Sequence, residues 1–239
     1  MISPSADVNT ILGHLRAVGV ERARRANSPA LAADVLAIKK YQQRRFAHTY
    51  ADLLASARHG PAARFFMEEL YGPQDFTRRD SQFARVVPAL VHVFPQEIVD
   101  VVSTLGELHA LSEALDTRMG NELPGEAAHV DAASYGAAWR ATGGLPRRNK
   151  QIALTLKVGT ALDLLTRKPL LRTSLRLMRG PAHAAGLKEL QKFLEAGFDT
   201  FKAMHGATEF LALVDEREKH LVSALFAGGD EKRAMPLLP

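Results

Sequence analysis

The sequence contains no cysteine among its 239 residues. Disulfides, thiol nucleophiles, thiolate-bound haem and cysteine-type zinc sites are therefore excluded, and the absence fits a reducing compartment. No apolar run approaches the ~20 residues of a membrane span. The first residues, MISPSADVNT, have neither the basic start nor the apolar centre of a secretory signal peptide. These absences predict a cytoplasmic protein with no transmembrane segment.

Several motifs of well-known enzymes are absent as well. The sequence has no HExxH, GxxxxGK(S/T), GxGxxG or GxSxG pattern, which disfavours the familiar hydrolases, NTPases and dinucleotide enzymes. A di-iron carboxylate centre would need two Glu-x-x-His pairs, and the chain offers one, from Glu126 to His129. Haem would need an axial ligand, for which His109 and His205 are available. We therefore predict no metal site, and the cofactor stays unknown.

Helical periodicity dominates the chain, and no segment alternates apolar and polar residues convincingly enough for a strand. The composition, 46% hydrophobic and 24% charged, is ordinary for a globular protein with a sizeable core. We predict an all-α fold, a multi-helix bundle of about nine or ten helices without a sheet. The expected helices cover residues 6–26, 29–58, 61–71, 76–94, 96–120, 129–141, 147–166, 169–179, 182–205 and 207–227.

One helical domain is expected over residues 1–228. Two closely packed lobes, 1–120 and 146–228, are the alternative, because breaks rich in glycine and proline flank a short helix between them. Residues 229–239 follow the last expected helix and mix charged residues and prolines with a few apolar ones. We expect them to form a loose C-terminal tail.

The segment RFFMEELYGPQDFTRRD combines a short aromatic helix with a helix stop and a new helix start. Glu69 falls on the same helical stripe as Phe65 and Phe66. A carboxylate among aromatic side chains must be paired, bound to a ligand or protonated. We therefore predict that Glu69 is buried and paired with a histidine or with an arginine such as Arg79 or Arg85.

Residues 65–71, FFMEELY, resemble the signature of a bacterial family known as FFLEELY-motif proteins. Met67 takes the place of the usual leucine, a substitution that conserves side-chain volume. Similar family sequences carry a following Arg-Asp pair and a proline-interrupted apolar helix, which correspond here to Arg79-Asp80 and Phe83 to Phe94. The likeness spans most of the chain. The resemblance implies a bacterial protein without an assigned activity, so it supplies no catalytic residues.

The expected helix 96–120 carries polar groups on its apolar face. His109, Ser112 and Asp116 lie among the leucines of that face, and Glu113 lies at its edge. One interpretation is a histidine–carboxylate site that binds a metal or a cofactor, or that moves a proton. The other is an internal hydrogen-bond network that fixes the register of the helix. Both interpretations predict that His109 and Asp116 point into the interior.

Other expected helices also carry polar residues on inner faces, among them Gln42, Thr49, His205 and Glu218. Together they predict a polar-lined cavity inside the bundle, which is the usual place for a ligand in such folds. The candidates for a buried polar site are Glu69, His109, Ser112, Asp116 and His205.

Positive charge gathers in residues 147–192, which hold eleven Lys or Arg against two acidic residues, a local charge of +9. The whole chain carries +5, so the remainder carries −4. Arg172, Arg176 and Arg179 lie on one side of the helix expected there, opposite its leucines. We predict that these arginines bind an anionic ligand, an acidic protein or an anionic membrane surface. Nucleic acid is less favoured, because no aromatic residues are interleaved. A solvated charge face is the alternative.

Two classes of function remain open from the sequence. One is a non-enzymatic binding or adaptor module with an interior polar-lined apolar pocket and a basic docking face. The other is a metal- or haem-dependent enzyme centred on His109, Asp116 and Glu69. The binding module is favoured, because no candidate constellation has the spacing of a known catalytic site.

Overall fold

The computed structural model describes residues 4–70, 72–123, 125, 130–142, 144–226 and 238–239. Within these ranges the chain forms twelve α-helices, one π-helical turn (η1) and no strand, which confirms the predicted all-α class. The first elements are α1 (Pro4–Ala26), α2 (Pro29–Thr49), α3 (Ala51–Ala55), α4 (Gly60–Phe65), η1 (Phe66–Leu70), α5 (Thr77–Val93) and α6 (Gln96–Asn121). They are followed by α7 (Ala132–Ala141), α8 (Gly144–Thr166), α9 (Pro169–Leu177), α10 (Arg179–Ala184), α11 (Lys188–Ala203) and α12 (Thr208–Phe226).

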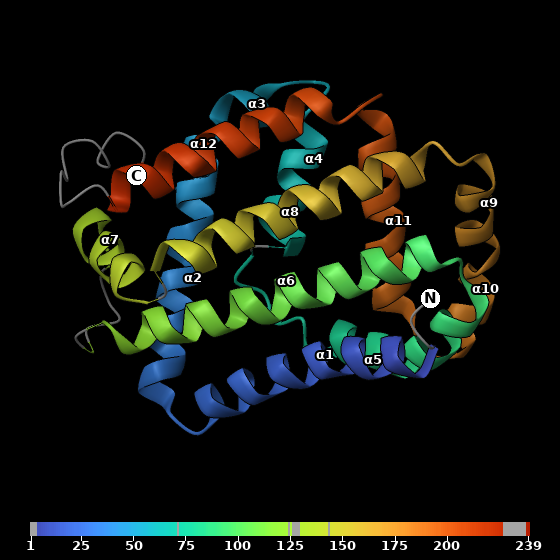
Figure 1. Ribbon diagram of the computed structural model, residues 1–239, viewed down its shortest axis with the longest axis horizontal. Helices are drawn as coiled ribbons and strands as arrows, with labels where there is room; N and C mark the ends of the chain where they lie inside the picture. The colour runs from blue at the N-terminus through green and yellow to red at the C-terminus, as the bar shows by residue number, and fades with distance from the viewer. Residues whose placement is uncertain (1–3, 71, 124, 126–129, 143, 227–237) are drawn as a thin grey trace.

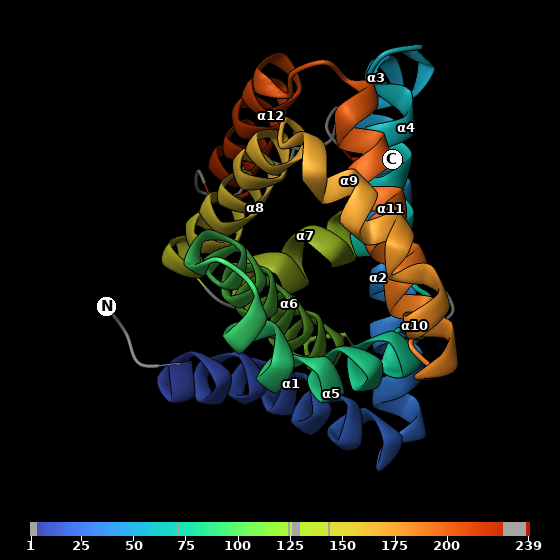
Figure 2. The same ribbon diagram turned by 90° about the vertical axis from the view of Figure 1, so that its right-hand side faces the viewer.

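The helices form two crossed layers (Figure 1). In the first layer α1, α6, α8 and α12 lie side by side, and each contacts the next. The second layer lies behind it and contains α2, α4 with η1, and α11, of which α2 contacts α6 and α11 contacts α8. Figure 2 shows the layers from the side, with α5 beside α1 and with α9 and α10 against α11. None of the described helices is both long and apolar enough to cross a membrane.

Capping residues set the starts of two helices that frame the space between the layers. Ser28 accepts a hydrogen bond from the Leu31 amide at the start of α2, and Pro29 occupies the first turn, where its missing N–H costs nothing. Asp131 and Ser134 form a reciprocal capping box at the start of α7. The helix expected at 129–141 therefore begins at 132.

Two helices that were expected to be continuous are broken. The expected helix 29–58 stops at Thr49, and α3 begins at Ala51 after the non-helical backbone of Tyr50. The expected helix 182–205 is divided because Gly186 has a φ of +70°, a left-handed conformation that ends α10 and that glycine adopts without strain. The breaks turn the chain at the edges of the layers.

A large apolar cluster joins helices from both halves of the chain. It contains Ile38 of α2 and Met119 of α6 together with Ile152 of α8 and Leu221 of α12. The segments 1–120 and 146–228, given above as the alternative of two closely packed lobes, both contribute to this core.

The last two residues of the chain also belong to this cluster. Leu238 is buried in it, and the Tyr41 hydroxyl donates a hydrogen bond to the Pro239 carbonyl at 3.3 Å. Residues 238 and 239 of the expected loose tail 229–239 therefore contact this core. Residues 229–237 lie outside the described part of the chain.

The aromatic segment noted in the sequence builds a second core. Phe66 packs against Phe201 of α11 and Phe210 of α12, with ring centroids 5.9 and 5.6 Å apart. Phe65 stacks on Phe193 of α11 at 5.6 Å. Burial of these rings fastens α4 and η1 to the two C-terminal helices.

Close helix contacts at two glycines draw the elements around the interior together. A Cβ on Gly120 of α6 would lie 2.6 Å from the side chain of Val35 on α2. A Cβ on Gly159 of α8 would lie 2.5 Å from Leu211 on α12. Both distances are below van der Waals contact. At Gly120 the Val35 backbone nitrogen would also lie at 3.3 Å from the Cβ, so this crossing favours glycine, whereas at Gly159 only the flexible end of Leu211 would have to move.

Candidate interior binding site

A cavity of about 80 Å³ lies between the two helical layers. Its wall is formed by side chains from α2, α6, α7, α8 and α12, with Phe66 of η1 and Phe76 at one side. The volume is enough for several water molecules. The wall carries six fully charged side chains, Lys39, Arg45, Glu113, Asp116, Arg148 and Glu218. Such a concentration of charge in an interior requires that each group be compensated.

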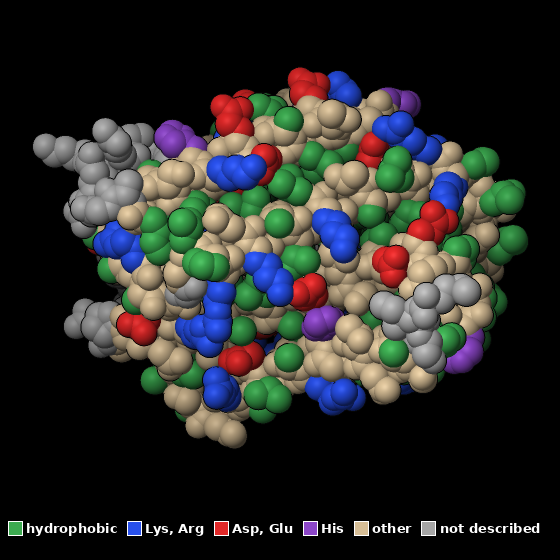
Figure 3. Space-filling model, in the orientation of Figure 1, with side chains coloured by type: hydrophobic (Ala, Val, Ile, Leu, Met, Phe, Trp, Pro, Cys, Tyr) green, Lys and Arg blue, Asp and Glu red, His purple; other side chains and the backbone are tan. Residues whose placement is uncertain are grey.

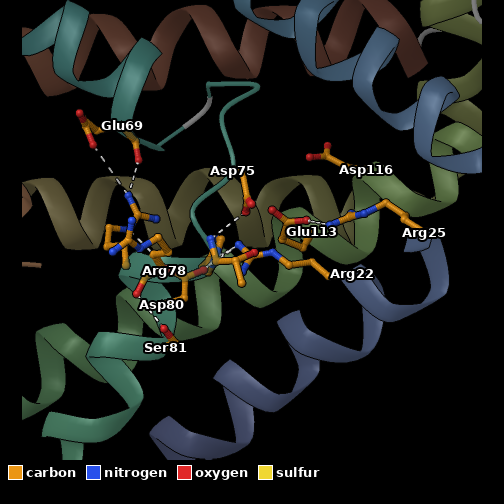
Figure 4. Close-up of polar contacts among 12 residues, drawn as sticks. Arg22, Arg25, Glu69, Asp75, Arg78, Asp80, Ser81, Glu113 and Asp116 are labelled. Carbon is orange, nitrogen blue, oxygen red and sulfur yellow. Dashed lines mark hydrogen bonds and ion pairs between the residues drawn. The ribbon is translucent and has the colours of Figure 1, made fainter. Parts of the chain in front are cut away.

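Glu113 is the most enclosed of the three carboxylates, with 5% of its side chain exposed. It accepts hydrogen bonds from Arg25 of α1 and from Lys39 of α2, the latter at 2.8 Å (Figure 4). Burial by itself raises the pKa of Glu113, but the charges of Lys39 and Arg25 outweigh this and lower the pKa to about 2. The ionised Glu113 carboxylate therefore ties α6 to two neighbouring helices.

The rest of the polar face of α6 also reaches both neighbours. Asp116 accepts a hydrogen bond from Gln42 of α2 at 3.0 Å, and one of its oxygens lies 3.3 Å from the Lys39 ammonium. Ser112 accepts a hydrogen bond from Gln151 of α8 at 2.9 Å. Asp116 and Ser112 both line the cavity, so the polar stripe seen in the sequence forms one of its walls.

His109 lines the cavity near α5 and pairs with Asp80, a residue of that helix. The His109 Nε2 lies 2.8 Å from Asp80 Oδ2, and Arg22 donates to the same oxygen at 2.7 Å. Arg79 donates to the other oxygen at 3.3 Å. Burial by itself raises the pKa of Asp80, but the His109 hydrogen bond and the arginine charges lower it to about 2. Asp80 thus stays ionised and orients the imidazole.

Glu218 of α12 is compensated on the opposite side of the cavity. It accepts hydrogen bonds from Arg45 at 2.5 Å and from the Tyr50 hydroxyl at 2.7 Å. Each carboxylate on the wall is therefore bonded to at least one donor, and two of them share Lys39.

Arg148 of α8 differs from the other charges, because it has no carboxylate at ion-pair distance within the described residues. The residue is 3% exposed. Its guanidinium donates to Gln151 at 3.2 Å and to Thr142 at 3.4 Å, contacts the Met119 sulfur at 3.1 Å, and lies 4.3 Å from the centre of the Trp139 ring. Burial lowers the pKa of Arg148, although the side chain keeps its charge at neutral pH.

Glu69 does not lie on the cavity wall, and the prediction that it is buried is wrong. Its side chain is 37% exposed, and its Oε2 is 4.0 Å from Arg79, one of the predicted partners. Arg79 also donates to the Glu69 backbone carbonyl at 2.9 Å (Figure 4). The cause is η1: a π-helical turn holds more residues than an α-helical one, so Glu69 is rotated away from the stripe of Phe65 and Phe66.

His205 also lies outside the cavity. It is exposed, with a φ of +53°, in the turn between α11 and α12. The helix on which it was expected ends at Ala203, so the helical stripe does not continue to it. The three residues named for a metal- or haem-dependent enzyme do not converge either, because Glu69 is missing from the wall shared by His109 and Asp116. Among the described residues, no three His, Asp or Glu side chains are placed to hold a metal ion.

Acidic residues of α11 neutralise two of the three arginines expected to bind an anion, Arg172 of α9 and Arg179 at the start of α10. Arg172 pairs with Asp199 at 2.6 Å, and Arg179 pairs with Glu195 at 2.5 Å. Arg176 is exposed and has no ion pair with any residue that the structure describes. The expected anion-binding face therefore has one unpaired arginine of three.

The apolar side of α9 is only partly covered, because Leu171 and Leu175 are half-buried while other leucines are exposed. Leu170 is 78% and Leu177 is 73% exposed. Figure 3 shows apolar side chains at the edge formed by α9, while Lys and Arg on the drawn face are interspersed with Asp and Glu. The +9 of residues 147–192 is thus not gathered into one patch on this face.

Arg148 is the main site residue that the sequence analysis missed, although a signal was present. Ile152, Thr155 and Gly159 follow it at intervals of four, seven and eleven residues, which places all four on one stripe of α8. An arginine on an apolar helical stripe predicts a buried polar site in the same way as Asp116 does on the stripe of α6. Asp80 gave no such signal, since it meets His109 only through the packing of α5 on α1 and α6.

A comparison with protein-family models finds a match over residues 21–232, to a family described as a domain of unknown function (DUF8198). The match covers the whole cavity wall, from Lys39 to Val222. No curated protein and no solved structure matches the chain.

Proposed function

Because the chain belongs to the DUF8198 family of unknown function, we propose its function from the geometry alone: it is a binding module that holds a small ligand in the cavity between its helical layers. The observation that carries this proposal is a cavity wall rich in charged and hydrogen-bonding groups that the protein's own side chains do not fill. Ligand sites in helical folds occupy such positions between facing helices.

Stability alone does not account for this interior. Replacing buried ion pairs with well-packed apolar residues is often neutral or stabilising, because removing charges from water is costly. Here Glu113, Asp116 and Glu218 surround a space that remains open. Fixed charges around an open space are the arrangement that orients a bound molecule.

The basic docking face gives weaker support to a binding function than the cavity does. Arg172 and Arg179 are paired with acidic residues of α11, so Arg176 is the remaining candidate there for an acidic partner or an anionic surface. The resemblance of residues 65–71 to FFLEELY-motif proteins, and a cytoplasmic location, stay predictions that add no activity.

Trp139 provides the test, because it is the single tryptophan of the chain and lines the cavity. We would titrate the full-length protein with propionate, propionamide and propylamine, recording Trp139 fluorescence and the melting temperature. A ligand that binds the folded state raises Tm in a concentration-dependent way. The expected result is saturable binding of at least one of these small molecules.

A cavity-filling variant locates the binding. Val222 lines the cavity, so Val222→Phe is expected to abolish saturation, whereas Val20→Phe, a matched change at a residue that is 57% exposed, is expected to preserve it. Binding that survives Val222→Phe unchanged, or no saturable binding of any probe by the unmodified protein, would overturn the proposed function.

A further inference from the structure

The charges around the cavity do not balance. Among the residues on the wall and those hydrogen-bonded directly to it, four are carboxylates and five are Lys or Arg: Asp80, Glu113, Asp116 and Glu218 against Arg22, Arg25, Lys39, Arg45 and Arg148. Arg22 is paired with Asp80. Arg25 and Lys39 are bonded to Glu113, Lys39 also approaches Asp116, and Arg45 is bonded to Glu218. The unmatched positive charge is therefore that of Arg148.

The hydrogen bonds of Arg148 leave part of its guanidinium unused. A guanidinium has five N–H donors. Two neutral oxygens, from Gln151 and Thr142, and the weakly accepting sulfur of Met119 are its partners among the described residues. Its Nε is fully buried and has no hydrogen-bond partner. The flat face of the group lies over Trp139. The unpartnered Nε–H lies on the guanidinium edge that it shares with Nη2, whose own partners are Thr142 and the weakly accepting Met119 sulfur.

A second unused donor lies near the same end of the cavity. Tyr135 of α7 is 1% exposed and lines the cavity, and its hydroxyl makes no hydrogen bond to any residue that the structure describes. Burial raises the pKa of Tyr135, and the charges of Arg45 and Arg148, which are close enough to act on it, oppose that rise. The Tyr135 hydroxyl therefore keeps its proton at neutral pH and can donate it in a hydrogen bond.

We propose that the cavity binds a small monoanion, a short-chain carboxylate, with its carboxylate on the edge of Arg148 and beside the Tyr135 hydroxyl. A guanidinium edge matches the two oxygens of a carboxylate, and charge-assisted pairs of this kind are the strongest hydrogen bonds in proteins. This inference rests on the proposed function and names the class of ligand.

The charge balance favours a monoanion over a phosphate. One unmatched positive charge is neutralised by one negative charge, whereas a phosphate dianion would leave a buried negative charge without a partner. The volume of about 80 Å³ limits the ligand to a few heavy atoms. Apolar lining residues, Val214, Val222 and Phe46, offer a surface for the short hydrocarbon part.

A charge series on the unmodified protein tests the proposal directly. Propionate, propionamide, propylamine and methyl phosphate would be compared by Trp139 fluorescence and by melting temperature. Propionate is expected to bind roughly tenfold or more tightly than its neutral isostere propionamide, since a hydrogen bond to a charged group contributes more than a neutral one. Propylamine and methyl phosphate are expected to bind more weakly than propionate.

Two variants then assign the charge preference to its residues. Arg148→Met is expected to abolish the preference for propionate over propionamide, and Tyr135→Phe to weaken propionate binding severalfold. Arg147→Met is the matched control, because Arg147 is the exposed neighbour in sequence, and it should leave both affinities unchanged.

The outcomes separate the two proposals. If propionamide or propylamine binds as tightly as propionate and Val222→Phe blocks that binding, the ligand-binding function stands and the monoanion inference fails. If methyl phosphate binds most tightly, the charge balance argued here is wrong. If no probe binds, both proposals fail. The wild-type comparison is decisive even if Arg148→Met does not fold.

Discussion

Two charge clusters of this protein are built from the same residue types and differ in their surroundings. On α6, Glu113 is 5% exposed, and its partners Arg25 and Lys39 are 12% and 16% exposed. Where α9 and α10 meet α11, each ion pair has one exposed member: Arg179 is 53% exposed beside Glu195 at 13%, and Asp199 is 51% exposed beside Arg172 at 23%. The first cluster joins α6 to α1 and α2. The second joins α9 and α10 to α11 at one edge of the molecule (Figure 2).

The comparison shows why the density of charge in the sequence pointed to the wrong region. Residues 147–192 carry +9, yet acidic residues of α11 neutralise Arg172 of α9 and Arg179 of α10, two of the three arginines expected to bind an anion. Solvent and salt weaken what remains of an exposed charge. Most of the charges on the cavity wall belong to the −4 remainder of the chain, where burial makes each one consequential.

Removal of the buried carboxylate should give the largest effect. Glu113→Ala leaves the Arg25 guanidinium without its carboxylate and deprives Lys39 of one partner, so the free energy of unfolding should fall by about 3–5 kcal/mol. Asp199→Ala, the matched change in the exposed cluster, should cost less than about 1 kcal/mol. Urea unfolding followed by circular dichroism measures both. Equal losses would mean that burial does not distinguish the two clusters.

Lowering the pH should destabilise the unmodified protein by protonating its buried carboxylates. The pKa values of Asp80 and Glu113 are about 2 in the folded protein, below the values of about 4 in an unfolded chain. The two carboxylates therefore contribute fully to the free energy of unfolding above pH 5, and this contribution is lost as the pH falls from about 4 through 2. Each should contribute about 2–3 kcal/mol to this loss.

The measurement is the free energy of unfolding at pH values between 6 and 2, with Glu113→Gln as the comparison. This variant has one fewer titrating carboxylate, so its stability should fall less steeply with acid. A Glu113→Gln curve parallel to that of the wild type would show that Glu113 titrates normally in the folded state.

In side-chain exposure, Glu69 lies between the buried carboxylate Glu113 and the exposed carboxylate Asp199. It was predicted to be buried, but it is 37% exposed and 4.0 Å from Arg79. Glu69→Ala should therefore lower the free energy of unfolding by less than about 1 kcal/mol, since the backbone bond from Arg79 to the Glu69 carbonyl is kept. Urea unfolding of this variant beside Glu113→Ala tests the assignment. A loss comparable to that of Glu113→Ala would restore the prediction of a buried charge.

The sequence predicted what depends on one helix at a time. The all-α class and the inward placement of His109, Ser112 and Asp116 follow from a 3.6-residue period within one segment. The position of Glu69 was predicted wrongly because a π-helical turn changes that period, and the residues FFMEELY give no indication of such a turn. The Asp80–His109 pair could not be predicted, since it depends on how α5 packs against α6.

Arg148 was not identified from the sequence for a different reason. Its stripe of Ile152, Thr155 and Gly159 was readable from the sequence, but the segment was interpreted by its total charge. Total charge describes the field outside a protein, whereas helical position decides whether a given arginine is inside it. A stripe-by-stripe inspection would have separated Arg148 from its exposed neighbour Arg147.

The smallest effect on stability is expected at Arg176. It is exposed and has no ion pair within the described residues, so Arg176→Glu should change the free energy of unfolding by no more than about 0.5 kcal/mol. Arg172→Glu should lower the free energy of unfolding more, because the new carboxylate would face Glu195 and Asp199 on α11.

The same pair of variants tests whether the basic face of α9 binds anionic surfaces. If α9 binds anionic vesicles at low salt, the unpaired Arg176 must supply much of the attraction, and Arg176→Glu should remove it while the protein stays folded. Binding that is lost with Arg172→Glu but kept with Arg176→Glu would show that the ion pairs on α11 open at the surface, and the two clusters would then differ less than their exposure indicates.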